Sequence, residues 1–390
     1  MLLSSGCQRP DPQRVRVISS LPRTGSARQV TESIVRGIRL ALDEVNSRVG
    51  RFEVEYLDLD NASAATGRWT SDGEAANARR AAQDPDVMAS IGPLNSGAAR
   101  VSMPILNYAD LLMVSPATTA VGLTKPGLGM PGEPAIYRPT GRLNFIRVVP
   151  ADDLQGPLAA AWAFGRGLRR VYVIDDAGSY GRGLASLFAD RCRELGMPVL
   201  AHVSIDPQTT DFKAFVASVL AADPDLIYFG GTTRTKGGQL ARDLGVAGCE
   251  AVLLVPDGCC EQAFIDAAGE AAVEARCFAT SGGLPPEQLT GRGRDFFVAY
   301  RDRYGSPPEA SAVYGYEAMR VVLRALATAG RKDRRAITDA ALATRDEDGL
   351  LGRWSVDANG DTTLRELSVY AVRGGRFVFE ETIAATGMGD

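Results

Sequence analysis

The sequence predicts an α/β protein made of two doubly wound lobes, each with a largely parallel sheet covered by helices on both faces. Its 390 residues, of which 45% are hydrophobic and 23% charged, suit two globular domains better than one. Short apolar runs alternate with segments of helical periodicity, which is the pattern of parallel βα units. This alternation starts near residue 15 and starts again after residue 152, which indicates two lobes.

The first run of the pattern occupies residues 15–114. Behind a short apolar strand, Ile34, Ile38 and Leu42 recur at the spacing of one helical face. A later helix can be capped by Ser71 or Asp72. In order, the expected elements are strand 15–18, helix 30–45, strand 52–56, helix 71–83, strand 87–91, helix 98–109 and strand 111–114.

The second run has the same rhythm, and its short apolar stretches are rich in Val, Ile, Leu and Phe. The expected elements are strand 171–174, helix 180–195, strand 199–205, helix 211–222, strand 226–229, a helix near 239, strand 251–255, a helix after 260 and strand 277–280. Between the two runs, the Gly- and Pro-rich segment 124–142 is too long for an ordinary connection and is predicted to be a surface insertion near the interlobe region.

In the C-terminal third, strands and helices no longer alternate. Helices are expected over 294–304, 310–329 and 333–343, and strands over 351–356, 364–372 and 376–379, with turn signals at 359–360 and 374–375. These helices need an existing sheet to pack on, so we expect them to return to the first lobe and the tail to cross to the second. The expected division is 1–14 as signal remnant and tether, 15–148 with 281–349 as lobe 1, and 149–280 with 350–390 as lobe 2.

Composition argues against several classes of function. The formal net charge of -4 and the lack of basic runs disfavour a nucleic-acid partner. With His202 as the one histidine, no Ser-His or Cys-His nucleophile and no histidine-based zinc site can be built. Residues 127–132 fit G-x-G-x-x-G, but no helical pattern follows to receive a dinucleotide. We expect no cofactor, no metal and no enzyme; the rival interpretation is a catalytic cleft carboxylate such as Asp257 or Asp176.

Five of the six cysteines stand out, and Cys192 lies apart from them. Small residues precede Cys7 as in a bacterial lipoprotein signal, which predicts cleavage and lipidation there; the alternative is an incidental thiol. A polar, Pro-containing stretch then follows as a tether. Cys249, Cys259, Cys260 and Cys277 cluster in the second lobe and could crosslink in an oxidising compartment or, less readily, bind metal. Their pairing stays open.

Five short motifs occur at the predicted strand ends. They are IGPLNSG at 91–97, MVSPATT at 113–119, DAGSYG at 176–181, YFGGT at 228–232 and VPDG at 255–258. In this order they resemble the ligand-binding signature of the leucine/isoleucine/valine-binding family of periplasmic proteins, and the resemblance extends from about residue 15 to 379. It implies the type I periplasmic binding protein fold, in which three crossings join two lobes that close over an amino acid.

The resemblance also implies which residues bind the ligand. Ser96, at a helix start, and Thr119 with the backbone of Ala117 would hold a carboxylate. Asp257 would face an ammonium group. The further expected ligand residues on the second lobe are Tyr180 and Thr232.

Two departures from the family pattern bear on specificity. Asp257 stands where glutamate is common, and Thr232 stands where tyrosine is common, with Arg234 close by. Because the acid is shorter and an aromatic wall is missing, the resemblance does not determine which ligand side chain the pocket accepts. The simpler interpretation of these polar residues, as caps and turn residues, also stays open.

The expected role is the extracytoplasmic solute-binding component of an ABC importer for a branched-chain or other amino acid, or a related small carboxylate. The expected partners are the ligand, ABC permease subunits and the membrane, reached through the lipid on Cys7 at the outer face of the cytoplasmic membrane. The alternatives are a sensor subunit with the same ligand and a binder of amine-free organic or aromatic acids. We expect closure about hinges near 148–150, 280–282 and 349–352, where the βα rhythm breaks.

Overall fold

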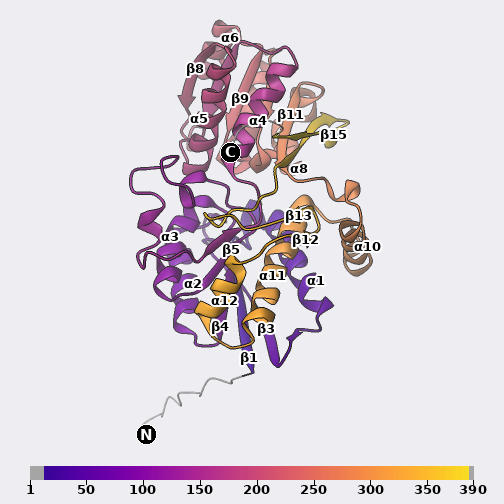
Figure 1. Cartoon of the computed structure of the whole chain (residues 1–390). Helices are drawn as coiled ribbons and strands as arrows, with labels where there is room; N and C mark the ends of the chain where they lie inside the picture. Colours follow the sequence, from indigo (N-terminus) through magenta and orange to yellow (C-terminus); the bar gives the residue numbers. More distant parts are fainter. Residues whose placement is uncertain (1–12, 386–390) are drawn as a thin grey trace.

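The computed structural model describes residues 13–385 and has two lobes, each built on one sheet (Figure 1). The first lobe has a six-stranded sheet and the second a seven-stranded sheet. Helices cover both faces of each, so the predicted class of two doubly wound lobes is confirmed. Cys7 lies outside the described residues.

The first lobe combines the N-terminal run with the C-terminal helices. Its elements are β1 (Arg14–Leu21), α1 (Arg28–Glu44), β2 (Arg48–Val49), β3 (Phe52–Asp60), α2 (Ser71–Gln83), β4 (Val87–Ile91), α3 (Ser96–Tyr108), β5 (Leu112–Ser115), β6 (Phe145–Arg147), α10 (Arg292–Tyr304), α11 (Ala310–Ala329), α12 (Arg334–Leu342), β12 (Glu347–Gly349) and β13 (Gly352–Trp354). The sheet order is β2-β3-β1-β4-β5-β6, and every pair except β2–β3 is parallel. Helices α1, α11 and α12 pack together on one face, and α2 and α3 on the other.

The second lobe is parallel in its middle and antiparallel at one edge. Its elements are α4 (Asp152–Gly165), β7 (Val171–Asp175), α5 (Ser179–Glu194), β8 (Val199–Ser204), α6 (Lys213–Ala222), β9 (Leu226–Gly230), α7 (Gly237–Val246), β10 (Val252–Val255), α8 (Gln262–Ala268), α9 (Glu270–Val273), β11 (Cys277–Gly282), β14 (Glu366–Arg373) and β15 (Arg376–Ala384). The sheet order is β15-β14-β11-β10-β9-β7-β8. Strands β14 and β15 supply the antiparallel edge, so the tail does cross to this lobe.

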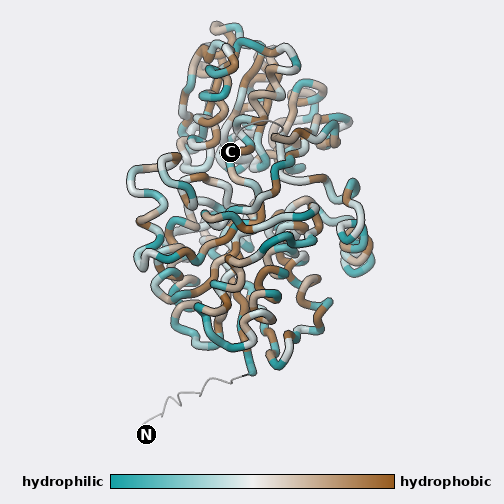
Figure 2. Tube along the Cα trace, in the orientation of Figure 1, coloured by the Kyte–Doolittle hydropathy of each residue, from teal (hydrophilic) through white to brown (hydrophobic). Residues whose placement is uncertain are grey.

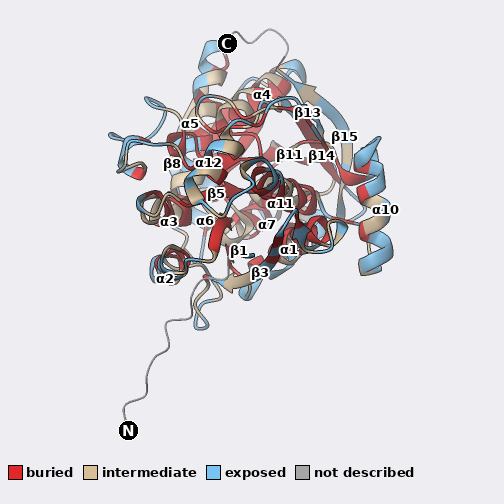
Figure 3. Cartoon of the chain, turned by 60° about the horizontal axis from the view of Figure 1, so that its bottom comes forward, coloured by how far each residue is buried: buried red, intermediate tan, exposed pale blue. Residues whose placement is uncertain are grey.

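Each lobe buries its own apolar core, as the hydropathy and burial views show (Figures 2 and 3). In α1 the predicted stripe of Ile34, Ile38 and Leu42 is buried against α11. Strands β4 and β5 are buried along their whole length, as a parallel sheet covered on both faces requires. In contrast, the solvent face of α10 is largely exposed (Figure 3).

The expected boundary of the first lobe at residue 349 differs from the structure. Hairpin β12–β13 places Leu350 and Trp354 in the first lobe's core. Farther on, Asp361 accepts a 2.7 Å hydrogen bond from Nε of the fully buried Arg147 on β6. The chain therefore stays with the first lobe until about Leu364, and 349–352 is no crossing. A buried salt bridge, which pattern analysis does not register, fixes this segment.

The insertion 124–142 is irregular and lies close to the second lobe, as expected. It holds one short 3-10 turn, Ala135–Tyr137. Nζ of Lys125 pairs with the carboxylate of Asp153 on α4 at 2.5 Å, which links this segment to the other lobe. Residues 127–132 lead into that turn and not into an α-helix, so they do not form a dinucleotide loop.

The single histidine and the cysteines within residues 13–385 all lie in the second lobe. His202 lies on β8, where Nε2 is 3.0 Å from Oδ2 of Asp175. Within residues 13–385 all cysteines are free thiols, and only Cys260 is partly exposed. The described part of the chain contains no helix with the length and apolar character needed to cross a membrane.

Candidate ligand-binding site

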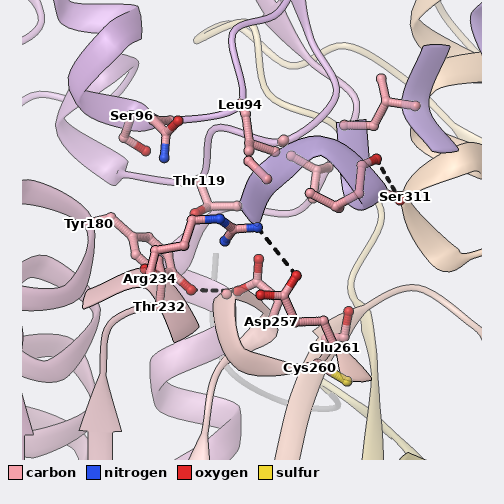
Figure 4. A pocket seen from close by; sticks show the side chains of 18 of the residues that line it. Leu94, Ser96, Thr119, Tyr180, Thr232, Arg234, Asp257, Cys260, Glu261 and Ser311 are labelled. Atoms are coloured by element: carbon pink, nitrogen blue, oxygen red, sulfur yellow. Dashed lines mark hydrogen bonds and ion pairs between the residues drawn. The ribbon is translucent and has the colours of Figure 1, made fainter. Parts of the chain in front are cut away.

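A pocket of about 700 Å³ lies between the two lobes, and all six predicted ligand residues line it (Figure 4). They come from both lobes and lie in the loops or at the helix starts that follow β4, β5, β7, β9 and β10. These are the carboxyl ends of parallel strands, where open α/β sheets place ligands. The six residues are Ser96, Ala117, Thr119, Tyr180, Thr232 and Asp257.

The first lobe presents hydrogen-bond donors to the pocket. Ser96 is the first residue of α3, where unpaired N–H groups and the helix dipole favour an anion. Its hydroxyl oxygen accepts from the Ala120 N–H at 3.3 Å, which leaves its own O–H to donate. Ser96 and Thr119 line the pocket and are almost fully buried. Ala117 also lines it, and its N–H donates to Oγ of Ser115 at 3.3 Å.

The second lobe presents a carboxyl group held by a phenol. The Tyr180 hydroxyl donates to Oδ1 of Asp257 at 2.7 Å. Burial raises the pKa of Asp257, and the hydrogen bonds from Tyr180 and Gln155 oppose that rise. Gly258 allows the close approach, because a Cβ there would lie 2.9 Å from the Gly231 carbonyl and 3.2 Å from the Tyr180 ring.

Asp152 is a buried acid next to the site that the sequence analysis missed. It begins α4, and its N–H donates to the Thr119 carbonyl at 2.9 Å, so it joins the two lobes beside a predicted ligand residue. Its carboxyl is 1% exposed, and Oδ1 has no hydrogen-bond partner. Burial, together with the charge of Asp257, raises its pKa to about 8. An acid at a helix N-terminus looks like an ordinary cap, so no sequence signal distinguished it.

Thr232 has a structural role in addition to lining the pocket. Its hydroxyl accepts from the Thr235 N–H at 3.2 Å, and Oγ1 of Thr235 accepts from the Thr232 N–H at 2.9 Å. Thr235 also donates to Oδ2 of the buried Asp176 at 2.7 Å. This capping box ties the loop after β9 to the loop after β7 and so fixes the position of Arg234 between them.

Arg234 brings a guanidinium into the same pocket (Figure 4). Its Nη2 is 3.3 Å from Oε2 of Glu261, and Nε is buried without a partner. From the first lobe, Arg68 donates to the Arg234 carbonyl at 3.0 Å. The two lobes are therefore already in contact across one end of the pocket.

The charges of the pocket are separated. Near Ser96 the first lobe presents hydroxyl donors and a helix N-terminus, and the second lobe presents Asp257 together with the Arg234–Glu261 pair. The hydroxyl donors opposite Asp257 suit a ligand with an anionic and a cationic end. Metal binding has no visible basis within 13–385, where no three His, Cys, Asp or Glu side chains gather closely enough to hold an ion.

Comparison with known proteins decides the family. A family model described as periplasmic binding protein matches residues 15–376. The chain belongs to the periplasmic binding protein family. The resemblance seen in the five motifs is thereby confirmed. This membership makes it an extracytoplasmic solute-binding protein, and its relatives are solute-binding proteins, not enzymes.

Individual relatives of this periplasmic binding protein cover nearly its whole length. It is 26% identical over 363 residues, 92% of each chain, to the Leu/Ile/Val-binding protein BraC3 of Rhizobium johnstonii. The leucine-binding protein LivK of Thermotoga maritima has 29% identity and a TM-score of 0.83, with 95% of this chain and 99% of that one covered. A solute-binding protein of R. palustris in complex with benzoate has 18% identity and a TM-score of 0.78, over 95% and 96% of the two chains.

Proposed function

We propose that this protein is the solute-binding component of an ABC importer and that it binds a free α-amino acid between its lobes. Ser96 and Thr119 hold the carboxylate, and Ala117 lines the pocket wall beside them. Asp257, oriented by Tyr180, holds the ammonium group. Leucine, isoleucine and valine appear in the names of similar proteins, which supports an amino acid as the ligand class.

One observation carries this proposal most directly. Asp257 lines the pocket and is half-buried, and Asp152, which is almost fully buried, lies close enough that the charge of Asp257 raises its pKa. A carboxylate in this setting is costly unless a cation neutralises it. The ammonium of an amino acid supplies that cation, and its carboxylate then reaches the donors on the first lobe.

Calorimetric titration with L-amino acids tests the proposal. A hydrogen bond to a charged group contributes about 1.5–3 kcal/mol, so Asp257→Ala and Ser96→Ala should each weaken binding roughly ten- to a hundredfold. Asp223→Ala, at an exposed position on the second lobe, serves as the control. If Asp257→Ala binds amino acids as well as the parent, the proposal is wrong.

An amine-free organic acid is the second candidate ligand. Arg234 in the pocket favours it, since its guanidinium could hold a carboxylate, and a protein of the same fold is known in complex with benzoate. In that case Asp257→Ala should strengthen binding, because removing an unpaired carboxylate near an anion relieves repulsion.

The further partners are the permease subunits of the importer and the membrane, to which lipidated Cys7 tethers the protein at the outer face. Expressed with its native export signal, Cys7→Ala should appear in the soluble fraction, and continued membrane association would contradict the tether. A sensor that passes the same ligand to a receptor is the alternative role. Radiolabelled amino-acid uptake should fall in a deletion strain if the protein serves an importer.

A further inference from the structure

We infer that the pocket selects an amino acid whose side chain ends in a carboxamide, and that Arg234 with Glu261 reads this group. The inference rests on the proposed function and deepens it. Both residues line the interlobe pocket beside Asp257, on the loops after β9 and β10 (Figure 4). They belong neither to the carboxylate half of the site nor to the pair of Tyr180 and Asp257 that faces the ammonium.

Arg234 supplies a donor that the protein leaves unused. Its side chain lines the pocket, is 15% exposed, and contacts Glu261 through Nη2 at 3.3 Å. A guanidinium group has five N–H donors, and this contact engages one of them, so a donor remains for a ligand acceptor. A side-chain carbonyl oxygen is such an acceptor.

Glu261 supplies the complementary acceptor. Its carboxylate contacts Arg234 at 3.3 Å, which is long for a charge-assisted hydrogen bond and leaves capacity for another donor. The N–H₂ of a carboxamide can donate to it while the carbonyl accepts from Arg234. One neutral group thus satisfies both partners at once.

Each of the other classes of ligand side chain would be repelled by one of these two residues or would leave their hydrogen bonds unreplaced. A ligand carboxylate would meet Arg234 but would lie beside the charge of Glu261. A ligand ammonium or guanidinium would meet Glu261 but would be repelled by Arg234. An aliphatic side chain would cover the ion pair and remove water from it without replacing the lost hydrogen bonds.

The loop that carries Arg234 is held firmly enough to be selective. The capping box of Thr232 and Thr235 fixes the turn, and Thr235 anchors it to Asp176. Across the cleft, Arg68 donates to the Arg234 carbonyl at 3.0 Å. In this arrangement of the lobes, Arg234 is therefore placed by contacts from both of them.

Calorimetry with sets of amino acids of similar shape tests this inference. The first set is L-asparagine, L-aspartate and L-leucine, and the second is L-glutamine, L-glutamate and L-methionine. In at least one set the parent should bind the amide at least tenfold more tightly than both companions. Arg234→Met should abolish the preference for the amide over the apolar member. Glu261→Gln should improve binding of the acid several-fold.

Arg242→Met provides the matched control, because this arginine lies on α7 with a half-exposed side chain and does not line the pocket. It should leave the ranking unchanged. Tighter binding of the apolar or acidic member than of the amide in both sets overturns the inference while the proposed function stands. An Arg234→Met variant that melts like the parent and keeps the preference overturns it as well. Absence of binding by every amino acid overturns the proposed function with it.

Discussion

The hydroxyl of Tyr180, in the first turn of α5, donates a 2.7 Å hydrogen bond to Oδ1 of Asp257, which follows β10. The bond fixes the direction of the carboxyl that faces the pocket. Removing it should therefore weaken binding without destroying the site. A net contribution of about 0.5–1.5 kcal/mol corresponds to roughly a two- to twelvefold loss of amino-acid affinity for Tyr180→Phe, measured by calorimetry. An unchanged dissociation constant would show that Tyr180 only lines the wall.

Asp152 should make the ligand-free protein less stable as the pH rises. Its pKa is raised from 3.8 to about 8 in the folded protein, because of burial and the nearby Asp257. Between these values the native state binds more protons than the unfolded state, so the free energy of unfolding falls with increasing pH. Between pH 5 and pH 8, the melting temperature of Asp152→Asn should fall by less than that of the parent. The exposed control Asp190→Asn should follow the parent; equal pH dependence of Asp152→Asn and the parent would contradict the assignment.

The buried pair of Arg147 and Asp361 should be essential to the first lobe. Its side chains are 0% and 5% exposed, and removing one partner of such a pair costs about 3–5 kcal/mol because the other charge stays buried. Urea unfolding should show this loss for Asp361→Asn, and replacing both residues with apolar ones should cost less than the two single changes combined. Arg193→Met, at an exposed pair, should cost under about 1 kcal/mol. A comparably small effect of Asp361→Asn would mean that the pair does not fix segment 349–364.

Ligand binding should compact the protein. The chain crosses between the lobes after β6, after β11 and after Leu364, and the site is divided between the lobes. Small-angle scattering with a saturating ligand should therefore give a smaller radius of gyration than without it. An unchanged radius, with binding proven in the same sample, would show that the free protein is already closed.

Much of the fold could be predicted because burial on both faces of a parallel sheet produces strong sequence patterns. The strands 87–91 and 226–229 are continuous apolar runs, and the structure places β4 and β9 there. The end of the first lobe could not be predicted, because Arg147 and Asp361 are far apart in sequence and each looks like a surface residue. Charged pairs of this kind carry no periodic signal.

The candidate site was predictable where loops follow strands and less so elsewhere. Five motifs located the pocket because parallel strands end at one edge of a sheet. Asp152 was missed because a helix-starting acid is common, and only its burial and its coupling to Asp257 distinguish it. The sequence placed Arg234 near the site, but its partner Glu261 required the structure.

The most direct test of the account compares an amino acid with the analogue that lacks only its amino group, titrated into the same protein. If Asp257 binds an ammonium group, the amino acid that binds most tightly should have at least tenfold higher affinity than its des-amino analogue. Asp257→Ala should remove most of this difference in affinity. Equal or tighter binding of the des-amino acid by the parent protein would contradict it.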